Sequence, residues 1–137
     1  MIRSFNLLSC IRKSPRIQEL AANREVIKAV SANPSVRNPE KAGYLYMIRE
    51  REFCRLEENV YKIGRSYHFE KRFSSYPKGS EIISCVFVQD QYKEERNLIR
   101  EFDGKFIQRS DIGREYYEGD RQEMIRCFLR FANQLYT

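Results

Sequence analysis

The sequence predicts an α+β fold, a small three-stranded and mainly antiparallel sheet flanked by helices. Three observations indicate this fold class. Residues 43–50 (GYLYMIRE) alternate and are rich in aromatic and β-branched residues, as strands are. Residues 81–89 (EIISCVFVQ) form a continuous apolar run, which is typical of a central strand covered on both faces. The C-terminal third carries apolar residues at helical spacing.

The first half of the predicted domain is a hairpin followed by a short helix. Residues 60–64 (VYKIG) are expected to be the hairpin partner of strand 43–50, across a charged turn at 51–59. A short helix is predicted from about 69 to 76. The Pro and Gly of YPKGS then turn the chain into the third strand.

Two longer helices follow the third strand. Asp90 can cap a helix that runs to about Phe106, and residues 108–113 (QRSDIG) are expected to form a loop. Asp120 and Glu123 resemble the start of a capping box for the last helix. The predicted order is therefore β-β-α-β-α-α. The last helix has one apolar stripe, made of Met124, Phe128, Phe131 and Leu135.

Composition and cysteine usage exclude several protein classes. With 137 residues, 32% charged and 42% hydrophobic, the chain has a globular composition. No run approaches the roughly 18 apolar residues that a membrane span needs. The four cysteines form no CxxC pair and His68 is the single histidine, so a structural zinc site is not expected. We expect reduced thiols and an intracellular location. The cysteines are Cys10, Cys54, Cys85 and Cys127.

The basic surplus lies in the N-terminal segment. Residues 1–42 hold eight Lys/Arg and three Glu, a net of +5, whereas residues 43–137 hold seventeen Lys/Arg and sixteen Asp/Glu, a net of +1. We expect a short amphipathic helix at 17–30 and a linker at 31–42, ahead of a domain at 43–137. A basic segment suits nucleic-acid phosphates or a membrane surface, or is merely solvated. Residues 1–18 also resemble a mitochondrial targeting peptide.

Two predicted helices carry a charge on an apolar face. Glu95 falls among Tyr92, Ile99, Phe102 and Phe106, whereas Glu94 points about 100° away, toward solvent. Arg72 lies among Phe69, Phe73 and Tyr76. A buried charge needs a partner. Either Arg72 and Glu95 form a structural ion pair, or both line a cleft that takes a metal ion and a phosphate.

Tyr46 and Lys62 are polar-tipped residues of the two hairpin strands, and both could reach one cleft. Tyr44, Tyr46 and Ile48 share one face of the first strand, and Lys62 shares a face with Val60 and Gly64 in the second. Each residue alone is ordinary, because tyrosine is common in strands and a strand lysine is usually solvated.

Taken together, these residues resemble the GIY-YIG nuclease superfamily over about residues 43–120. The first motif of that family matches Tyr44-Leu45-Tyr46, and the YIG motif falls on Lys62-Ile63-Gly64. Its arginine falls on Arg72 and its metal-binding glutamate on Glu95, with Tyr76 four residues after the arginine. The lysine at 62 and the lack of a clear asparagine after Glu95 depart from the family pattern. The KIG variant and the ending G-x-EYYEGD are similar to the branch found in phages and large DNA viruses.

The resemblance implies a metal-dependent endonuclease acting on DNA. Glu95 would hold a single Mg²⁺ or Mn²⁺, and Arg72 would clamp the phosphate. Tyr46 would orient or deprotonate the attacking water, which requires a depressed pKa, and Lys62 would stand in for the second family tyrosine. Tyr76 is a further catalytic candidate. Arg65, Tyr44 and Lys78 are expected to contact the nucleic acid.

The same residues leave two other functions open. One is a nucleic-acid-binding module of the same fold that does not cut. The other is a structural domain in which Arg72 and Glu95 only pair. No small-molecule cofactor and no membrane partner are expected. If the protein is viral, its location is the cytoplasm or nucleus of the infected host.

Overall fold

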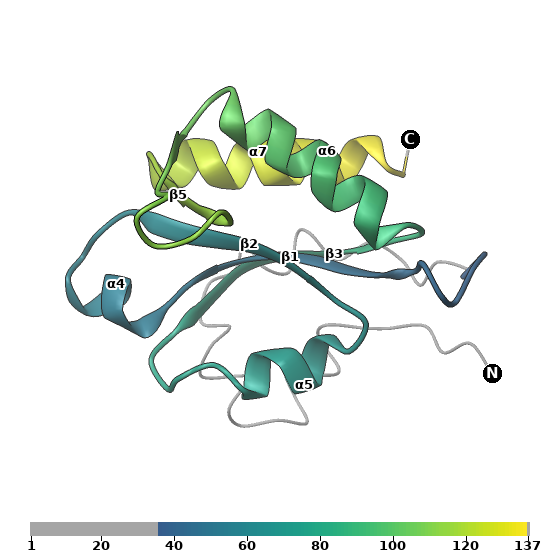
Figure 1. The fold of residues 1–137 in the computed structure, drawn as a ribbon, viewed down its shortest axis with the longest axis horizontal. Helices are drawn as coiled ribbons and strands as arrows, with labels where there is room; N and C mark the ends of the chain where they lie inside the picture. The colour runs from purple at the N-terminus through teal and green to yellow at the C-terminus, as the bar shows by residue number, and fades with distance from the viewer. Residues whose placement is uncertain (1–35, 137) are drawn as a thin grey trace.

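The computed structural model describes residues 36–136 as a sheet with helices on both faces (Figure 1). The predicted helix at 17–30, the targeting-like residues 1–18 and part of the linker lie outside the described residues. The elements in order are β1 (Gly43–Arg49), α4 (Arg51–Arg55), β2 (Val60–Ser66), α5 (Phe69–Ser74), β3 (Glu81–Val88), α6 (Gln91–Asp103), β4 (Ile107–Gln108), β5 (Tyr116–Glu118) and α7 (Arg121–Gln134).

The α+β class and the hairpin are confirmed. β1 and β2 pair antiparallel, with Tyr46 opposite Gly64 and Ile48 opposite Lys62. The two predicted caps also form. The Asp90 carboxylate accepts a hydrogen bond from the Lys93 backbone N–H at 3.1 Å, and the Asp120 carboxylate accepts from that of Glu123 at 3.0 Å.

The prediction of three strands is wrong, because the described sheet has five, in the order β3-β1-β2-β5-β4. β4 and β5 have two and three residues, too few to show the alternation that identifies a strand. The predicted loop at 108–113 therefore begins inside β4. The predicted charged turn at 51–59 contains the single-turn helix α4.

β3 is also not central, since β1 is its only partner among the described strands. Its continuous apolar run is explained by cover on both faces instead. Ile83, Val86 and Val88 pack in the larger core, whereas Ile82 and Cys85 pack in the smaller one. A register shift between Met47 and Ile48 of β1 interrupts the β1–β3 pairing.

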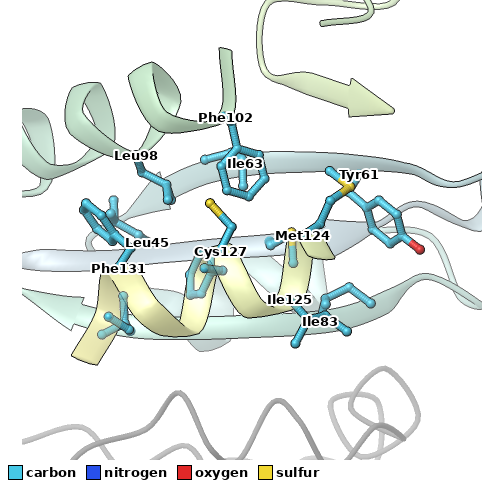
Figure 2. Close-up of a cluster of buried hydrophobic side chains, with 14 of the residues drawn as sticks. Leu45, Tyr61, Ile63, Ile83, Leu98, Phe102, Met124, Ile125, Cys127 and Phe131 are labelled. Carbon is cyan, nitrogen blue, oxygen red and sulfur yellow. The ribbon is translucent and has the colours of Figure 1, made fainter. Parts of the chain in front are cut away.

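Two cores hold the sheet, one on each face. The larger core lies between the sheet and helices α6 and α7, as Figure 2 shows for Leu45, Ile63, Leu98, Phe102 and Phe131. The smaller core lies on the opposite face of the sheet, the face on which Figure 1 shows α5. It is mostly aromatic: Tyr44, Tyr46, Phe69, Phe73 and Tyr76, with Ile48, Ile82 and Cys85.

The buried stripe of α6 differs in part from the predicted one. Gln91, Leu98 and Phe102 are its buried residues, whereas Tyr92 and Ile99 are only half-buried. Glu95 lies four residues after Gln91 and three before Leu98, so it does belong to the inward stripe. Glu94 is half-buried rather than directed into solvent, and its carboxylate accepts from the Asn97 amide at 2.9 Å.

The residues just before β1 are attached to the domain. The Lys41 carbonyl accepts a hydrogen bond from the Gln91 backbone N–H at 2.8 Å, and the Ala42 carbonyl accepts from the Gln91 side chain at 3.2 Å. Residues 36–42 thus cover the start of α6. None of the helices in residues 36–136 is long and apolar enough to cross a membrane.

Candidate active site

Tyr46 lies across Gly64, its partner on the neighbouring strand. The ring is 1% exposed and packs on the α5 face. A Cβ at position 64 would lie 2.4 Å from both Cζ and Oη of Tyr46. Because Gly64 of the KIG motif has no side chain, the Tyr46 ring can lie over it and reach its hydrogen-bonding partners.

Arg72 of α5 and Tyr76, two residues after that helix, meet at the hydroxyl of Tyr46 in β1. Arg72 Nε donates to Tyr46 Oη at 3.2 Å, and the hydroxyls of Tyr46 and Tyr76 lie 3.1 Å apart. The Arg72 guanidinium also lies over the Tyr76 ring, 5.4 Å from its centroid. Arg72 is exposed, not buried on the apolar face of α5 as its position suggested, so it can reach both Tyr46 and solvent.

The Tyr46 phenol is held in its neutral form. Burial raises its pKa well above the ordinary value, the hydrogen bond with Tyr76 raises it further, and the hydrogen bond from Arg72 opposes both only in part. The expectation of a depressed pKa is therefore not met by the residues around it. A neutral phenol suits hydrogen bonding and orientation better than proton abstraction.

Lys62 lies on the same face of the sheet, between two aromatic rings. Its ammonium is 5.5 Å from the Tyr76 ring centroid and 5.6 Å from that of Tyr116. The Lys62 side chain is 14% exposed, and Nζ lies 3.9 Å from a carboxylate oxygen of Glu115. Tyr116 in turn donates a hydrogen bond to the Glu50 carboxylate. Lys62 thus joins the Tyr46 cluster to two acidic residues.

Glu95 reaches β2 from the other face. Its side chain is 17% exposed and pairs with Arg65, whose Nε donates to Oε1 at 3.2 Å. Burial raises the pKa of Glu95, Arg65 opposes this shift and the charge of Glu115 adds to it. Glu95 therefore does not form the ion pair with Arg72 that the sequence left open, because each has a different partner.

Glu115 lies between the two groups of residues, at the edge of β2. β5 pairs with β2 only over Val60–Lys62, so the rest of β2 extends past it. Glu115 precedes β5, and its carbonyl accepts from the Ile63 backbone N–H at 2.9 Å. Its carboxylate faces Lys62 and is close enough to Glu95 to affect its pKa. Glu115 therefore links the two faces.

The carboxylates at this edge are too few to supply all the ligands of a metal ion, but they are enough for a hard cation that keeps most of its water ligands. In residues 36–136 no group of three or more His, Cys, Asp or Glu side chains could hold a metal ion. Mg²⁺ needs only one or two protein carboxylates, because it keeps several of its waters. Glu95 suits this role, since a cation relieves the electrostatic cost of its burial beside Glu115.

The three residues predicted to contact nucleic acid lie in different surroundings, and only two of them are accessible. Arg65 lies at the edge beside Glu95, and Lys78 is exposed in the turn before β3. Tyr44 is a core residue, 7% exposed, with its ring edge-on to Phe69 and Phe87, so it does not fit direct contact with nucleic acid.

Sequence reasoning did not single out Glu50, Glu115 or Tyr116. Glu115 and Tyr116 belong to the ending EYYEGD, which contributes to the family resemblance but does not by itself indicate a role for either residue. Their roles depend on β5 lying beside β2, and a three-residue strand has too little pattern to predict that pairing.

A protein-family model matches a stretch within the described residues. Residues 43–132 match the model of the T5orf172 domain, a phage-associated domain. Neither the curated proteins nor the solved structures contain a significant match. The matched residues run from β1 nearly to the end of α7 and make up most of the chain. The chain therefore belongs to the T5orf172 domain family.

Proposed function

We propose that the domain is a GIY-YIG-type endonuclease that hydrolyses DNA phosphodiester bonds with a single Mg²⁺ or Mn²⁺. The observation that carries the proposal is the meeting of Tyr46, Arg72 and Tyr76 at one hydroxyl, with Lys62 against the Tyr76 ring. These are the positions that the resemblance to GIY-YIG nucleases marks as catalytic. A hydrophobic core has no need for a polar cluster of this kind.

Each residue of the cluster has a role that its surroundings support. Arg72 is exposed and anchored through Nε, so its guanidinium is oriented to bind a phosphate. Tyr46 is neutral and buried, so it would help to orient the attacking water through the hydrogen bonds that join its hydroxyl to Arg72 and Tyr76. Lys62 carries a positive charge on the same face, where it opposes the negative charge that develops on the phosphate.

Glu95 is the residue that would hold the ion. A bound divalent ion stabilises charge on the scissile phosphate and on the leaving oxygen. With Glu95 holding an ion, Arg65 would be available to a DNA phosphate, since its side chain is 38% exposed. The activity belongs inside a cell, which agrees with the free thiols of Cys54, Cys85 and Cys127.

A second candidate function is DNA binding without cleavage. The pairing of Glu95 with Arg65 favours it, because the carboxylate already has a cationic partner. The raised pKa of Tyr46 favours it too, because the phenol is a poor base. The purely structural alternative loses its main support, since Arg72 and Glu95 do not pair.

A cleavage assay with two adjacent glutamates tests the proposal. Supercoiled, linear, branched and single-stranded DNA are incubated with Mg²⁺, Mn²⁺ or EDTA. We expect metal-dependent cleavage by the wild type, loss of cleavage in Glu95→Gln and near wild-type cleavage in Glu94→Gln, which is also half-buried on α6. Equal activity in all three proteins contradicts the role of Glu95. DNA binding with no cleavage under any condition supports the second candidate.

A further inference from the structure

An aromatic cluster borders the proposed site on the α6 side of β2. Tyr67 follows β2, in the segment that leads to α5, and Tyr92 lies in the first turn of α6. Their rings meet edge-to-face with centroids 6.4 Å apart, and their hydroxyls are hydrogen-bonded at 2.5 Å. Arg65 lies over the Tyr92 ring, 4.3 Å from its centroid. We name Tyr67, Tyr92 and Arg65 the tyrosine shelf.

The tyrosine shelf is open to solvent and fixed in place. Tyr67 is 44% exposed, one of five large hydrophobic residues so exposed in the described part of the chain. Its hydroxyl contacts the Glu40 carbonyl as well as Tyr92, so the ring is held at its hydroxyl end. Arg65 already lies over the Tyr92 ring, so Tyr67 is the ring that offers an open face, because its edge-to-face contact with Tyr92 covers at most one of its two faces. A rigid aromatic surface of this kind can bind a flat ligand with little loss of side-chain entropy.

The tyrosine shelf is connected directly to the residue proposed to hold the ion. Arg65 contacts Tyr92 through its guanidinium and Glu95 through Nε, at 3.2 Å. A nucleotide whose phosphate lies near Glu95 and Arg65 therefore has its base within reach of Tyr67 and Tyr92. Aromatic rings beside a cationic group are the usual means of holding unpaired bases.

We propose that the tyrosine shelf stacks an unpaired nucleobase next to the cleavage site. This inference rests on the proposed function and narrows its substrate to DNA with a single-stranded portion, such as a flap, a gap or a branch. In intact duplex DNA the base faces are covered by neighbouring bases, so a ring could stack only after a base is flipped out. The stacking is independent of base identity, because every base has a π-face.

Two exposed tyrosines provide a matched test. Tyr67→Leu removes the stacking ring, and Tyr136→Leu is the control, because Tyr136 is 42% exposed and its hydroxyl also contacts a backbone carbonyl, that of Phe87. Binding of flap, gapped and blunt duplex DNA is measured by fluorescence anisotropy in EDTA, which removes cleavage from the measurement. A 2-aminopurine placed in the single-stranded portion reports stacking through quenching of its fluorescence.

We expect Tyr67→Leu to weaken binding of flap and gapped DNA by about fivefold or more, in line with the loss of one stacked base. Blunt-duplex affinity should be nearly unchanged, and the 2-aminopurine quenching should disappear. Tyr67→Phe should retain both. Equal effects of Tyr67→Leu and Tyr136→Leu, or quenching that survives in Tyr67→Leu, overturn the inference. Failure of the wild type to bind any DNA instead contradicts the proposed function itself.

Discussion

The ring of Tyr46 occupies the space that a side chain at Gly64 would need. A Cβ at that position would lie 2.4 Å from the Tyr46 hydroxyl, so Gly64→Ala must displace the ring or the strand. Overpacking of a buried site costs about 1–3 kcal/mol. We expect a loss of unfolding free energy in that range by urea denaturation, together with loss of the Tyr46–Arg72 hydrogen bond and of cleavage.

Two comparisons separate this clash from a general effect of alanine. Gly104→Ala should be close to neutral, since a Cβ there lies no nearer than 3.7 Å to the atoms around it. In a Tyr46→Ala background, Gly64→Ala should cost much less, because the ring is gone. An unchanged cost in that background would show that Tyr46 is not the residue Gly64 accommodates.

Glu95 should make the folded protein less stable at neutral pH. The pKa of Glu95 is higher in the folded protein than in the unfolded chain, so the folded state favours the protonated carboxyl. As the pH rises through the folded pKa, Glu95 becomes charged and the free energy of unfolding falls. We expect Glu95→Gln to increase the free energy of unfolding at pH 7 in EDTA. The gain should shrink as the pH falls and vanish below 4.5, the ordinary value, where Glu95 is protonated in both states. A gain that is independent of pH argues against this origin.

Lys62 should affect catalysis more than affinity. Lys62→Met keeps the aliphatic stem between the rings of Tyr76 and Tyr116 and removes the charge. We expect a loss in cleavage rate of about a hundredfold or more, as for removal of one charge-stabilising group, with a much smaller loss of DNA affinity. Lys105→Met removes the same charge on the α7 side and should leave cleavage unchanged. Equal rates for the two variants exclude a catalytic role for Lys62.

The N-terminal segment should contribute to non-specific DNA binding. Residues 1–35 hold six Lys/Arg and two Glu, a net of +4. Deleting them should weaken binding and flatten its salt dependence, because fewer phosphates are neutralised. The deletion should stop at 35, since Lys41 and Ala42 bond to Gln91. A full-length variant with the six basic residues changed to Gln should behave like the deletion, and an unchanged salt slope would rule out a DNA-binding role.

The sequence predicted the fold well where elements are long and regular. The β1–β2 hairpin and the two capped helices follow from alternation, helical spacing and the acids Asp90 and Asp120. β4 and β5 were missed because short strands depend on the sheet beside them more than on their own residues. The sequence did not predict that β3 lies at the edge of the sheet. A continuous apolar run indicates that both faces of a strand are buried, but it does not indicate how many strands pair with it.

For the candidate site, the sequence indicated the residues but not their partners. Tyr46, Arg72 and Tyr76, which the resemblance marks as catalytic candidates, meet at one hydroxyl, although Arg72 was expected on an inward face and is exposed. The residue spacing within α6 predicted that Glu95 faces inward, and its side chain is 17% exposed. Its ion-pair partner, however, is Arg65 rather than Arg72. Partner choice depends on how the helices cross the sheet, and α5 and α6 lie on opposite faces of it (Figure 1).

The residues of the candidate site come from two separate parts of the sequence, and this affects the local stability of the site. The phenol cluster comes from one continuous stretch, between residues 46 and 76, whereas Glu115 is placed beside it by the three-residue strand β5. β5 has only the two-residue strand β4 on its outer side, so we expect it to open more readily than the hairpin, even though Tyr117 is buried in the larger core. Such an opening separates Glu115 from Lys62 without disturbing the Tyr46 hydroxyl. Amide hydrogen exchange should therefore be faster at residues 116–118 than in β1, and the charge balance around Lys62 should fluctuate with it.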